Sequence, residues 1–319
     1  MTTISQIARR ARVSTATVSN VLNRTKPVSP QTRELVESVA RELGYSPSRF
    51  ARSLKTGRSA TIGLIAPDLT NPFFPAVVQT VERTARERGY GLIIVDCHND
   101  PAEEKAAFEL VGEYRVDGII WIPVAETKPE PAPLAPVVTV DRPVAGLDGI
   151  TSDHRAGGRM IGERVRRAGH GTVGILRGPS AHHSARERHR GLLEGLGDGV
   201  RIVWDVPTDF SLDLAEEAQA KILGTAVDCI VGANDQVAIR TAQLLAAAGR
   251  ALPDDVAIVG FDDIPWAEFV HPPLSTVRQP YRRLGRAAVE LLLRRIAEPD
   301  GEPERIVLPV EWVGRASLG

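Results

Sequence analysis

This sequence of 319 residues is poor in cysteine, in aromatic residues and in long apolar runs. Its two cysteines, Cys97 and Cys229, are too few for a disulfide framework, and both lie in apolar runs that predict small buried core residues. No apolar run approaches the roughly 20 residues that span a bilayer, and residues 1–14 contain no apolar signal core. These absences argue against membrane and exported proteins, and we expect the chain in the cytoplasm.

The motifs of common nucleotide-binding and hydrolytic enzymes are missing as well. No Gly-x-Gly-x-x-Gly run follows the first predicted strand, and the chain has neither a Walker loop nor a Gly-x-Ser-x-Gly elbow. The first strand-to-helix turn, at 67–71, is unsuited to cradling a phosphate. His98, His182 and His183 lack a third coordinating partner. We therefore expect no enzyme: no catalytic residue, no metal and no cofactor.

The charge of the chain is unevenly distributed. Residues 1–60 hold 11 lysines and arginines against three acidic residues, a net charge of +8, and the remainder carries −9. A basic segment on an acidic body suggests a polyanion as the partner of that segment alone. The alternative is a basic surface that is merely solvated.

Two short helices are predicted within the basic segment. Thr3 and Gln6 have the spacing of a capping box and predict a helix from residue 4 to about residue 10. Ser14 provides a second N-cap, which predicts another helix over 15–23. Two such helices joined by a tight turn form a helix-turn-helix, whose second helix enters the major groove of DNA.

A third helix completes a small bundle. Ser29 caps it, Pro30 occupies its first turn and Gly44 ends it. Its apolar stripe consists of Leu35, Val36, Val39, Ala40 and Leu43.

The second helix has the side chains that read bases. Packing of residues 18, 21 and 22 leaves Thr15, Ala16, Ser19 and Asn20 facing outward. An asparagine can pair with N6 and N7 of adenine, and the methyl groups of Thr15 and Ala16 suit that of thymine. The other interpretation is a solvated helix surface. The candidates for phosphate contact are Arg10, Arg24, Lys26 and Arg33.

Residues 46–57 predict one or two further helical turns that need a partner, either a symmetry mate or DNA. Leu54, between Arg52 and Lys55, has the character of a wedge that kinks a base step from the minor groove. The alternative is a linker leucine docked on the body.

These features resemble the start of a lac repressor (LacI/GalR) family regulator, over the run TISQIARRARVSTATVSNVLNRTKPVSPQTRELVESVARELGYSPSRFARSLKTGRSATIGLIAPDLTNPFF. Fragments such as DGIIWIP, GILRGP and VGANDQVAIRTAQLLAAAGRALPDDVAIVGFDDIPWAEFVHPPLSTVRQP extend the likeness along the whole chain. The resemblance implies that Leu54 enters the centre of the operator. The expected DNA-binding set is Ser14, Thr15, Ala16, Thr17, Ser19, Asn20, Ala51, Leu54 and Lys55.

Three positions depart from the family pattern. Arg12 stands where the turn often has glycine, which predicts slight backbone strain. Asn20 stands where many members have arginine, so the operator should differ at the matching base pair. His154 stands where asparagine is usual, which affects the chemistry of the ligand nearby.

From residue 61 the chain alternates predicted strands and helices in two runs, as is typical of parallel sheets with right-handed crossovers. The strands, the first four of them expected to be buried, are 61–66, 91–96, 118–122, 137–140, 172–176, 201–204, 229–232, 257–261 and 305–308. The helices are 72–88, 101–115, 156–168, 184–195, 212–223, 236–248 and 282–296.

The predicted fold is an N-terminal three-helix helix-turn-helix DNA-binding domain plus an α/β periplasmic-binding-protein-like domain of two doubly wound parallel-sheet subdomains. The headpiece takes residues 1–57, with a hinge helix at about 47–56, and the effector-binding and dimerisation domain takes 58–319. The subdomains span about 61–152 with 279–308, and about 153–278 with 309–319.

Ligands of such sheets bind beyond the carboxyl ends of the strands. Carboxylates, amides, an arginine and aromatic rings at these ends suit a polyhydroxyl ligand. Without the resemblance, the polar residues there are equally read as caps and turn formers, and the phenylalanines as core. With it, the expected ligand-binding set is Asn71, Phe73, Phe74, Asp141, Arg188, Phe210, Asn234 and Asp262.

Together these features predict a transcriptional repressor that binds a pseudo-palindromic double-stranded DNA operator as a homodimer. A small effector, a sugar in the first place, would bind between the subdomains and control operator affinity. The alternatives are a nucleoside- or purine-responsive regulator of the same family and, further off, a solute-binding protein. No membrane partner is expected.

Overall fold

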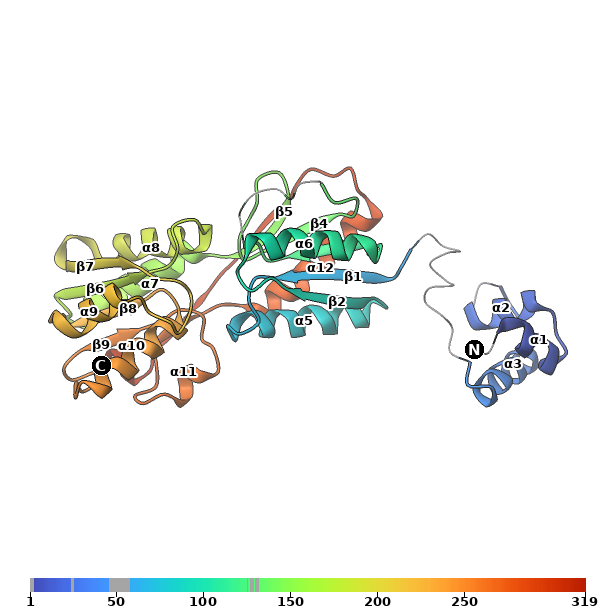
Figure 1. Ribbon diagram of the computed structural model, residues 1–319, viewed down its shortest axis with the longest axis horizontal. Coiled ribbons are helices and arrows are strands. Elements are labelled where there is room, and N and C mark those ends of the chain that lie inside the picture. The colour runs from blue at the N-terminus through green and yellow to red at the C-terminus, as the bar shows by residue number, and fades with distance from the viewer. Residues whose placement is uncertain (1–2, 24–25, 46–57, 125, 127–128, 130–131) are drawn as a thin grey trace. The chain divides into compact units, whose positions relative to one another are not determined.

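The computed structural model describes residues 3–23, 26–45, 58–124, 126, 129 and 132–319. The chain divides into two compact units, Met1–Ala60 and Thr61–Gly319 (Figure 1). Ala51, Leu54 and Lys55 of the predicted hinge lie outside the described residues. No helix within these described ranges is long and apolar enough to cross a membrane.

The N-terminal unit is a bundle of three short helices, α1 (Ile4–Ala11), α2 (Thr15–Asn23) and α3 (Pro30–Glu42). Ile7, Val18 and Val36 are fully buried where the helices meet. Leu35 was wrongly predicted as part of the buried stripe of α3, and its side chain is 47% exposed. The stripe is narrower than the sequence suggested because three short helices enclose only a small core.

Side-chain caps and a strained turn set the path of the helix-turn-helix. Thr3 and Gln6 form the predicted capping box at the start of α1. Ser14 Oγ accepts a hydrogen bond from the backbone N–H of Thr17 at 3.0 Å and begins α2. Between the helices Arg12 has φ 53°, in the left-handed region that favours glycine, and this confirms the predicted strain.

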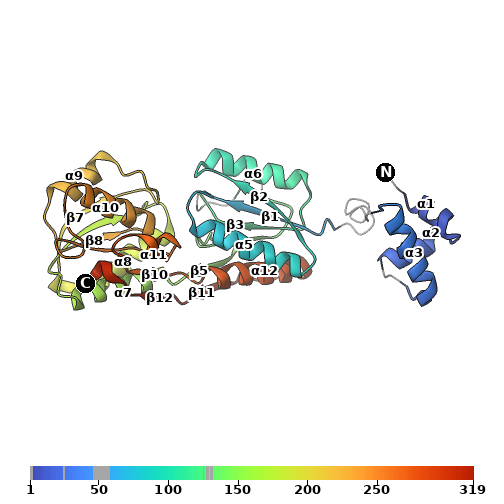
Figure 2. The same cartoon turned by 90° about the horizontal axis from the view of Figure 1, so that it is seen from below.

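The second unit contains two parallel sheets, and the first has the strand order β11-β5-β4-β3-β1-β2. Its strands are β1 (Thr61–Ala66), β2 (Gly91–Asp96), β3 (Gly118–Trp121), β4 (Val137–Val140), β5 (Asp148–Ser152) and β11 (Arg305–Leu308). Helices α5 (Phe73–Glu87) and α12 (Tyr281–Ala297) pack on one face, and α6 (Pro101–Glu113) covers the other (Figure 2).

Two features of this sheet differ from the prediction. Strand β2 was predicted to be buried but lies at the sheet edge, where Ile94 is 45% exposed. Strand β5 was not predicted, because its sequence DGITS is largely polar. It is nevertheless buried throughout, since it lies between β4 and β11.

The second sheet has the order β7-β6-β8-β9, formed by β6 (Thr172–Arg177), β7 (Arg201–Pro207), β8 (Cys229–Gly232) and β9 (Ala257–Val259). Its helices are α7 (His154–Arg167), α8 (His183–Leu196), α9 (Glu216–Gly224), α10 (Asp235–Ala247) and the short α11 (Trp266–Phe269). Helix α9 begins four residues after its predicted start, because Ser211 and Asp213 form a turn in which the Asp213 N–H donates to Ser211 Oγ at 3.0 Å.

The chain passes between the two sheets after β5, after β10 (Thr276–Arg278) and after β11. Strand β10 pairs antiparallel with β12 (Glu311–Val313) beside the second sheet. Neither strand was predicted, because three residues carry too little pattern to stand out from a loop.

Helices α7 and α8 approach each other closely because glycines face each other across their contact. A Cβ atom on Gly158 of α7 would lie 2.0 Å from the carbonyl oxygen of Arg188 in α8. A Cβ atom on Gly191 of α8 would lie 2.0 Å from the carbonyl oxygen of Arg155. The backbones therefore touch, and this sets the distance between the first turn of α7 and the middle of α8.

Replacing Gly158 with alanine should destabilise the protein by about 3 kcal/mol or more, because the helices must separate to admit the new methyl group. Thermal or denaturant unfolding measures this loss. Gly112→Ala in α6 is the matched control, because nothing lies within 4 Å of a Cβ atom there. It should be neutral or slightly stabilising, and equal losses in the two variants would contradict the close approach of α7 and α8.

Candidate functional site

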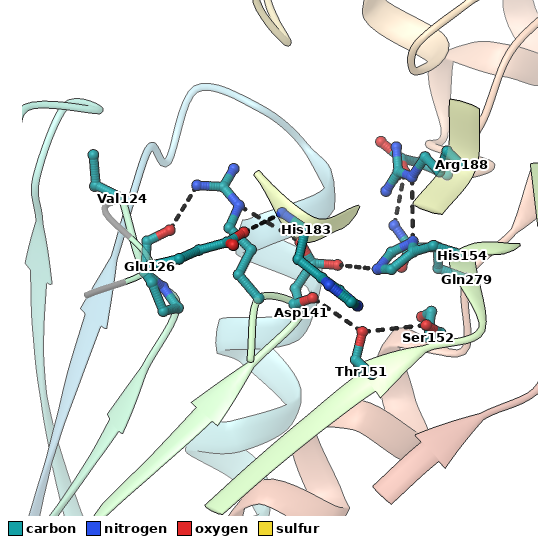
Figure 3. Close-up of polar contacts among 12 residues, drawn as sticks. Val124, Glu126, Asp141, Thr151, Ser152, His154, His183, Arg188 and Gln279 are labelled. Carbon is teal, nitrogen blue, oxygen red and sulfur yellow. Dashed lines mark hydrogen bonds and ion pairs between the residues drawn. The ribbon is translucent and has the colours of Figure 1, made fainter. Parts of the chain in front are cut away.

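Charged and polar side chains from both sheets meet between the carboxyl ends of the strands (Figure 3). Asp141 directly follows β4 of the first sheet, and His154 begins α7 where the chain enters the second sheet. Arg188 lies in the middle of α8, Asp262 follows β9, and Gln279 follows β10. All five are buried, with exposed fractions between 1% and 9%.

These five residues form a continuous chain of contacts, which we name the buried network. His154 Nε2 lies 3.2 Å from Asp141 Oδ1, and His154 Nδ1 accepts a hydrogen bond from Arg188 Nε at 3.2 Å. Arg188 Nη2 lies 3.2 Å from Asp262 Oδ1, and that oxygen also accepts from Gln279 Nε2 at 2.7 Å. The buried network therefore links the end of β4 in the first sheet to four segments of the second: α7, α8 and the segments that follow β9 and β10.

The Arg188 guanidinium is fixed on further sides. Its Nη1 donates to the carbonyl oxygen of Ala233 at 3.0 Å. It lies 3.9 Å from the ring centroid of Phe261 and 5.4 Å from that of Phe210, both within cation–π range. Arg188 is thus oriented by contacts before any ligand arrives.

The two carboxylates of the buried network have unusual backbone conformations. Asp141 has φ 66° and Asp262 has φ 122°, both in the region that favours glycine. The carbonyl oxygen of Asp141 accepts a hydrogen bond from Thr151 Oγ1 at 3.0 Å, which supports its conformation. Strain of this kind costs about 1–3 kcal/mol per residue and clusters at functional sites.

The same two carboxylates have opposite pKa shifts. Burial alone would raise the pKa of Asp141, but the close contact with His154 and the charges of Arg188 and Arg142 hold it well below its usual range. Burial raises the pKa of Asp262 to about 6, although Arg188 and Gln279 oppose the shift. Perturbed carboxylates beside a fixed arginine are typical of a binding site.

Beneath the buried network lies another carboxylate, Asp235, which is fully buried. Its oxygens accept from the backbone N–H of Ile264 at 2.8 Å and from Thr276 Oγ1 at 2.6 Å. Burial, together with the nearby charge of Asp262, raises its pKa to about 7.

The wild type should lose stability as pH rises from about 4 to 7, because Asp235 ionises. Replacing Asp235 with asparagine should remove this pH-dependent loss. The folded protein holds the Asp235 proton more tightly than the unfolded chain does, whose ordinary pKa is about 3.9. Ionisation therefore destabilises the fold, on the order of 4 kcal/mol at neutral pH. Melting temperatures across this range should fall less in the variant, and parallel profiles would contradict the shift.

Three residues of this region were missing from the predicted set. His154 and Gln279 belong to the buried network, and Arg142, 2% exposed, donates from Nη1 to the carbonyl oxygen of Pro123 at 2.6 Å. Within the described part of the chain, Arg142 Nε and Gln279 Oε1 have no hydrogen-bond partner, and Asp141 Oδ1 and His154 Nε2 lie close to each other without forming a hydrogen bond. A buried polar atom without a partner costs about 1–3 kcal/mol, so Arg142 Nε and Gln279 Oε1 are suited to a bound molecule.

The predicted ligand set gathers around the buried network to differing degrees. Asp141, Arg188 and Asp262 are members of it, and Phe210 lies against Arg188. Asn234 caps α10, because its Oδ1 accepts from the Val237 N–H at 2.9 Å, and it follows the residue whose carbonyl oxygen receives Arg188.

The remaining predicted residues lie at the start of α5. Asn71 Oδ1 accepts from the Phe73 N–H at 3.1 Å. Phe73 and Phe74 are buried in edge-to-face contact, 5.4 Å between ring centroids. Phe73 and Asp262 line a cavity of about 160 Å³ together with Asp263 and residues of α5, α11 and α12.

In the N-terminal unit, the predicted contact residues lie on or beside α2. Ser14, Thr15 and Ala16 are exposed, whereas Thr17, Ser19 and Asn20 are half-buried. Val18 and Val21 face the core, so the helix presents the predicted residues away from it.

A helix-turn-helix bundle followed by two parallel α/β sheets with a polar site between their strand ends defines a ligand-responsive DNA-binding protein. Residues 3–48 match the family model of bacterial regulatory proteins of the lacI family. Residues 163–318 match the model of a periplasmic binding protein-like domain. These matches confirm the predicted fold class.

Curated relatives cover the whole chain. The chain is 32% identical to the ribose operon repressor of Escherichia coli (strain K12), over 99% of this chain and 100% of that protein. It is also 32% identical to the HTH-type transcriptional repressor PurR of Photobacterium profundum, over 100% of this chain and 99% of that protein. The chain therefore belongs to the lacI family, a non-enzymatic family of transcriptional regulators, which confirms that it is not an enzyme.

Solved structures of lacI-family regulators are similar to this chain as well. The lac repressor dimer bound to operator and the anti-inducer ONPF matches with a TM-score of 0.89 and 26% identity, over 99% of each chain. A LacI family transcriptional regulator from Enterococcus faecium with bound ribose matches with a TM-score of 0.71 and 27% identity, over 81% of this chain and 98% of that one.

Proposed function

We propose that this protein is a cytoplasmic repressor that binds a pseudo-palindromic operator as a homodimer and responds to a pentose, ribose in the first place. The effector binds at the buried network between the two sheets. The observation that carries the proposal is the pairing of Arg188 with Asp262 beside Asp141, Arg142 and Gln279. Family membership and the operator-bound lac repressor dimer support the DNA-binding part.

The chemistry of the site favours a small polyhydroxyl ligand. Carboxylates accept from sugar hydroxyls and arginines donate to them, so the buried network offers both partners that each hydroxyl needs. Phe73, Phe74 and Phe210 supply aromatic faces for the apolar side of a sugar ring. A relative named as a ribose repressor and a related structure with bound ribose point to the same ligand.

At the other end of the chain, Thr15, Ala16 and Asn20 read bases in the major groove, and Ser14, Thr17 and Ser19 support that contact. Ala51, Leu54 and Lys55 also contact the operator, with Leu54 as the wedge between base pairs at its centre. The domain limits proposed are headpiece 1–57, with a hinge helix at about 47–56, and effector-binding domain 58–319.

Calorimetry and thermal shift with ribose, other pentoses, hexoses, hypoxanthine and guanine test the effector. Ribose should bind and raise the melting temperature. Selection of operators from genomic fragments, with and without ribose, then tests the DNA response. Binding of a purine but no sugar would replace the pentose proposal with the purine alternative, and no salt-sensitive binding to any duplex would contradict the regulator itself.

A further inference from the structure

His154 occupies the junction between the two sheets. It is the first residue of α7, directly after the chain leaves β5, and its side chain is 1% exposed. One ring nitrogen faces Asp141 of the first sheet, and the other faces Arg188 of the second (Figure 3). Its ring also lies 5.9 Å from that of Phe261, centroid to centroid, the same ring that supports Arg188.

Its neighbours fix the protonation state of this histidine. A guanidinium has only donors, so the contact with Arg188 Nε requires a bare, accepting Nδ1. With Nδ1 bare, the ring proton is on Nε2, which lies 3.2 Å from Asp141 Oδ1, a close contact that lacks hydrogen-bond geometry. Burial lowers the pKa of His154, and the charge of Arg188 acts in the same direction, although Asp141 opposes both. The neutral Nε2–H tautomer is the form that accepts from Arg188 and places its proton on the side of the Asp141 carboxylate.

We propose that His154 is the positioning residue of the effector site. His154 holds the Arg188 guanidinium against Asp262 and links the orientation of that guanidinium to Asp141 of the first sheet. The inference rests on the proposed function of this site. Arg188 Nη1 and Nη2 are held by Ala233 and Asp262, both in the second sheet. His154 alone joins the Nε edge of that guanidinium to the first sheet through side-chain contacts given by the described residues.

The donor and acceptor pattern predicts which substitutions are tolerated. The Oδ1 of asparagine can lie where Nδ1 of His154 lies and accept from Arg188 Nε, so His154→Asn keeps that contact, although its shorter side chain does not reach Asp141 as Nε2 does. His154→Leu fills similar space but provides neither contact. His170→Asn is the matched control, because His170 follows the other end of α7 and contacts the carbonyl oxygen of Leu318 through Nε2 at 3.0 Å.

The first test needs no ligand. In ¹⁵N NMR of the wild type, His154 should show the Nε2–H tautomer, and the Arg188 Nε–H signal should be protected from exchange. That signal should persist in His154→Asn and His170→Asn and be lost in His154→Leu. An imidazolium, the opposite tautomer, or a protected Arg188 signal in folded His154→Leu would overturn the proposal. If His154→Leu fails to fold, the tautomer of His154 in the wild type and the Arg188 signal in His154→Asn still test the proposal.

The second test is calorimetric binding of ribose. His154→Leu should weaken it about 10- to 100-fold, the cost of losing a buried hydrogen bond to a charged group. His154→Asn and His170→Asn should stay close to wild type. Equal losses in His154→Asn and His154→Leu would overturn the positioning role. Absence of ribose binding in the wild type would instead refute the pentose effector, and the NMR result would then judge the role of His154 separately.

Discussion

Replacing Asp262 with asparagine should abolish the response to ribose while leaving the operator affinity of the ligand-free protein unchanged. The Asp262 carboxylate faces Arg188 at 3.2 Å and accepts from Gln279 at 2.7 Å. Asparagine loses the charge and one accepting oxygen, so the contacts with Arg188 and Gln279 are no longer made to a charged carboxylate. Because a buried hydrogen bond to a charged group is worth about 1.5–3 kcal/mol and two are affected, ribose affinity should fall about 100-fold or more.

Calorimetry measures the affinity for ribose, and fluorescence anisotropy on labelled operator DNA measures the operator affinity of the ligand-free protein. Asp148→Asn is the matched control, because Asp148 is also a buried carboxylate paired with an arginine, Arg295 Nε at 2.6 Å, but at the start of β5. It should lower stability and keep the ribose response. If Asp148→Asn loses the response too, general destabilisation explains the Asp262 result. If Asp262→Asn retains ribose binding, the buried network is not the effector site.

The sequence predicted the members of the buried network that directly follow predicted strands. Asp141 and Asp262 stand at strand ends, where the parallel-sheet rule places ligands, and the family resemblance added Arg188 within a helix. The resemblance also marked His154 as unusual, but not its two partners. The contact with Arg188 depends on the distance between α7 and α8, which the glycines at 158 and 191 set across the fold, and the contact with Asp141 depends on where the first sheet places the end of β4.

Residues brought in by the crossovers between sheets were harder to predict. Gln279 follows β10, a strand of three residues that local pattern does not reveal. Strand β5 was missed because its polar residues are buried by β4 and β11 rather than by their own hydrophobicity. In both places tertiary contacts, which depend on distant parts of the chain, override local propensity.

On the DNA-binding side, replacing Asn20 with alanine should relax base preference at one position of each operator half-site. Burial of Val18 and Val21 turns α2 so that Asn20 is presented on its other side. A bidentate contact from an asparagine to adenine is worth about 1–3 kcal/mol of discrimination. A dimer makes the contact twice, so the loss on a symmetric operator should be about double that on a single half-site.

Selection of bound sequences from a random pool should show the change as one flattened position per half-site. Arg33→Ala is the contrasting control, since Arg33 is exposed on α3 and is a candidate for phosphate contact. Loss of a phosphate contact should weaken binding to all sequences alike and reduce the salt dependence by about one ion per headpiece. An unchanged sequence preference in Asn20→Ala, or a preference altered equally by Arg33→Ala, would show that α2 does not read the operator through Asn20.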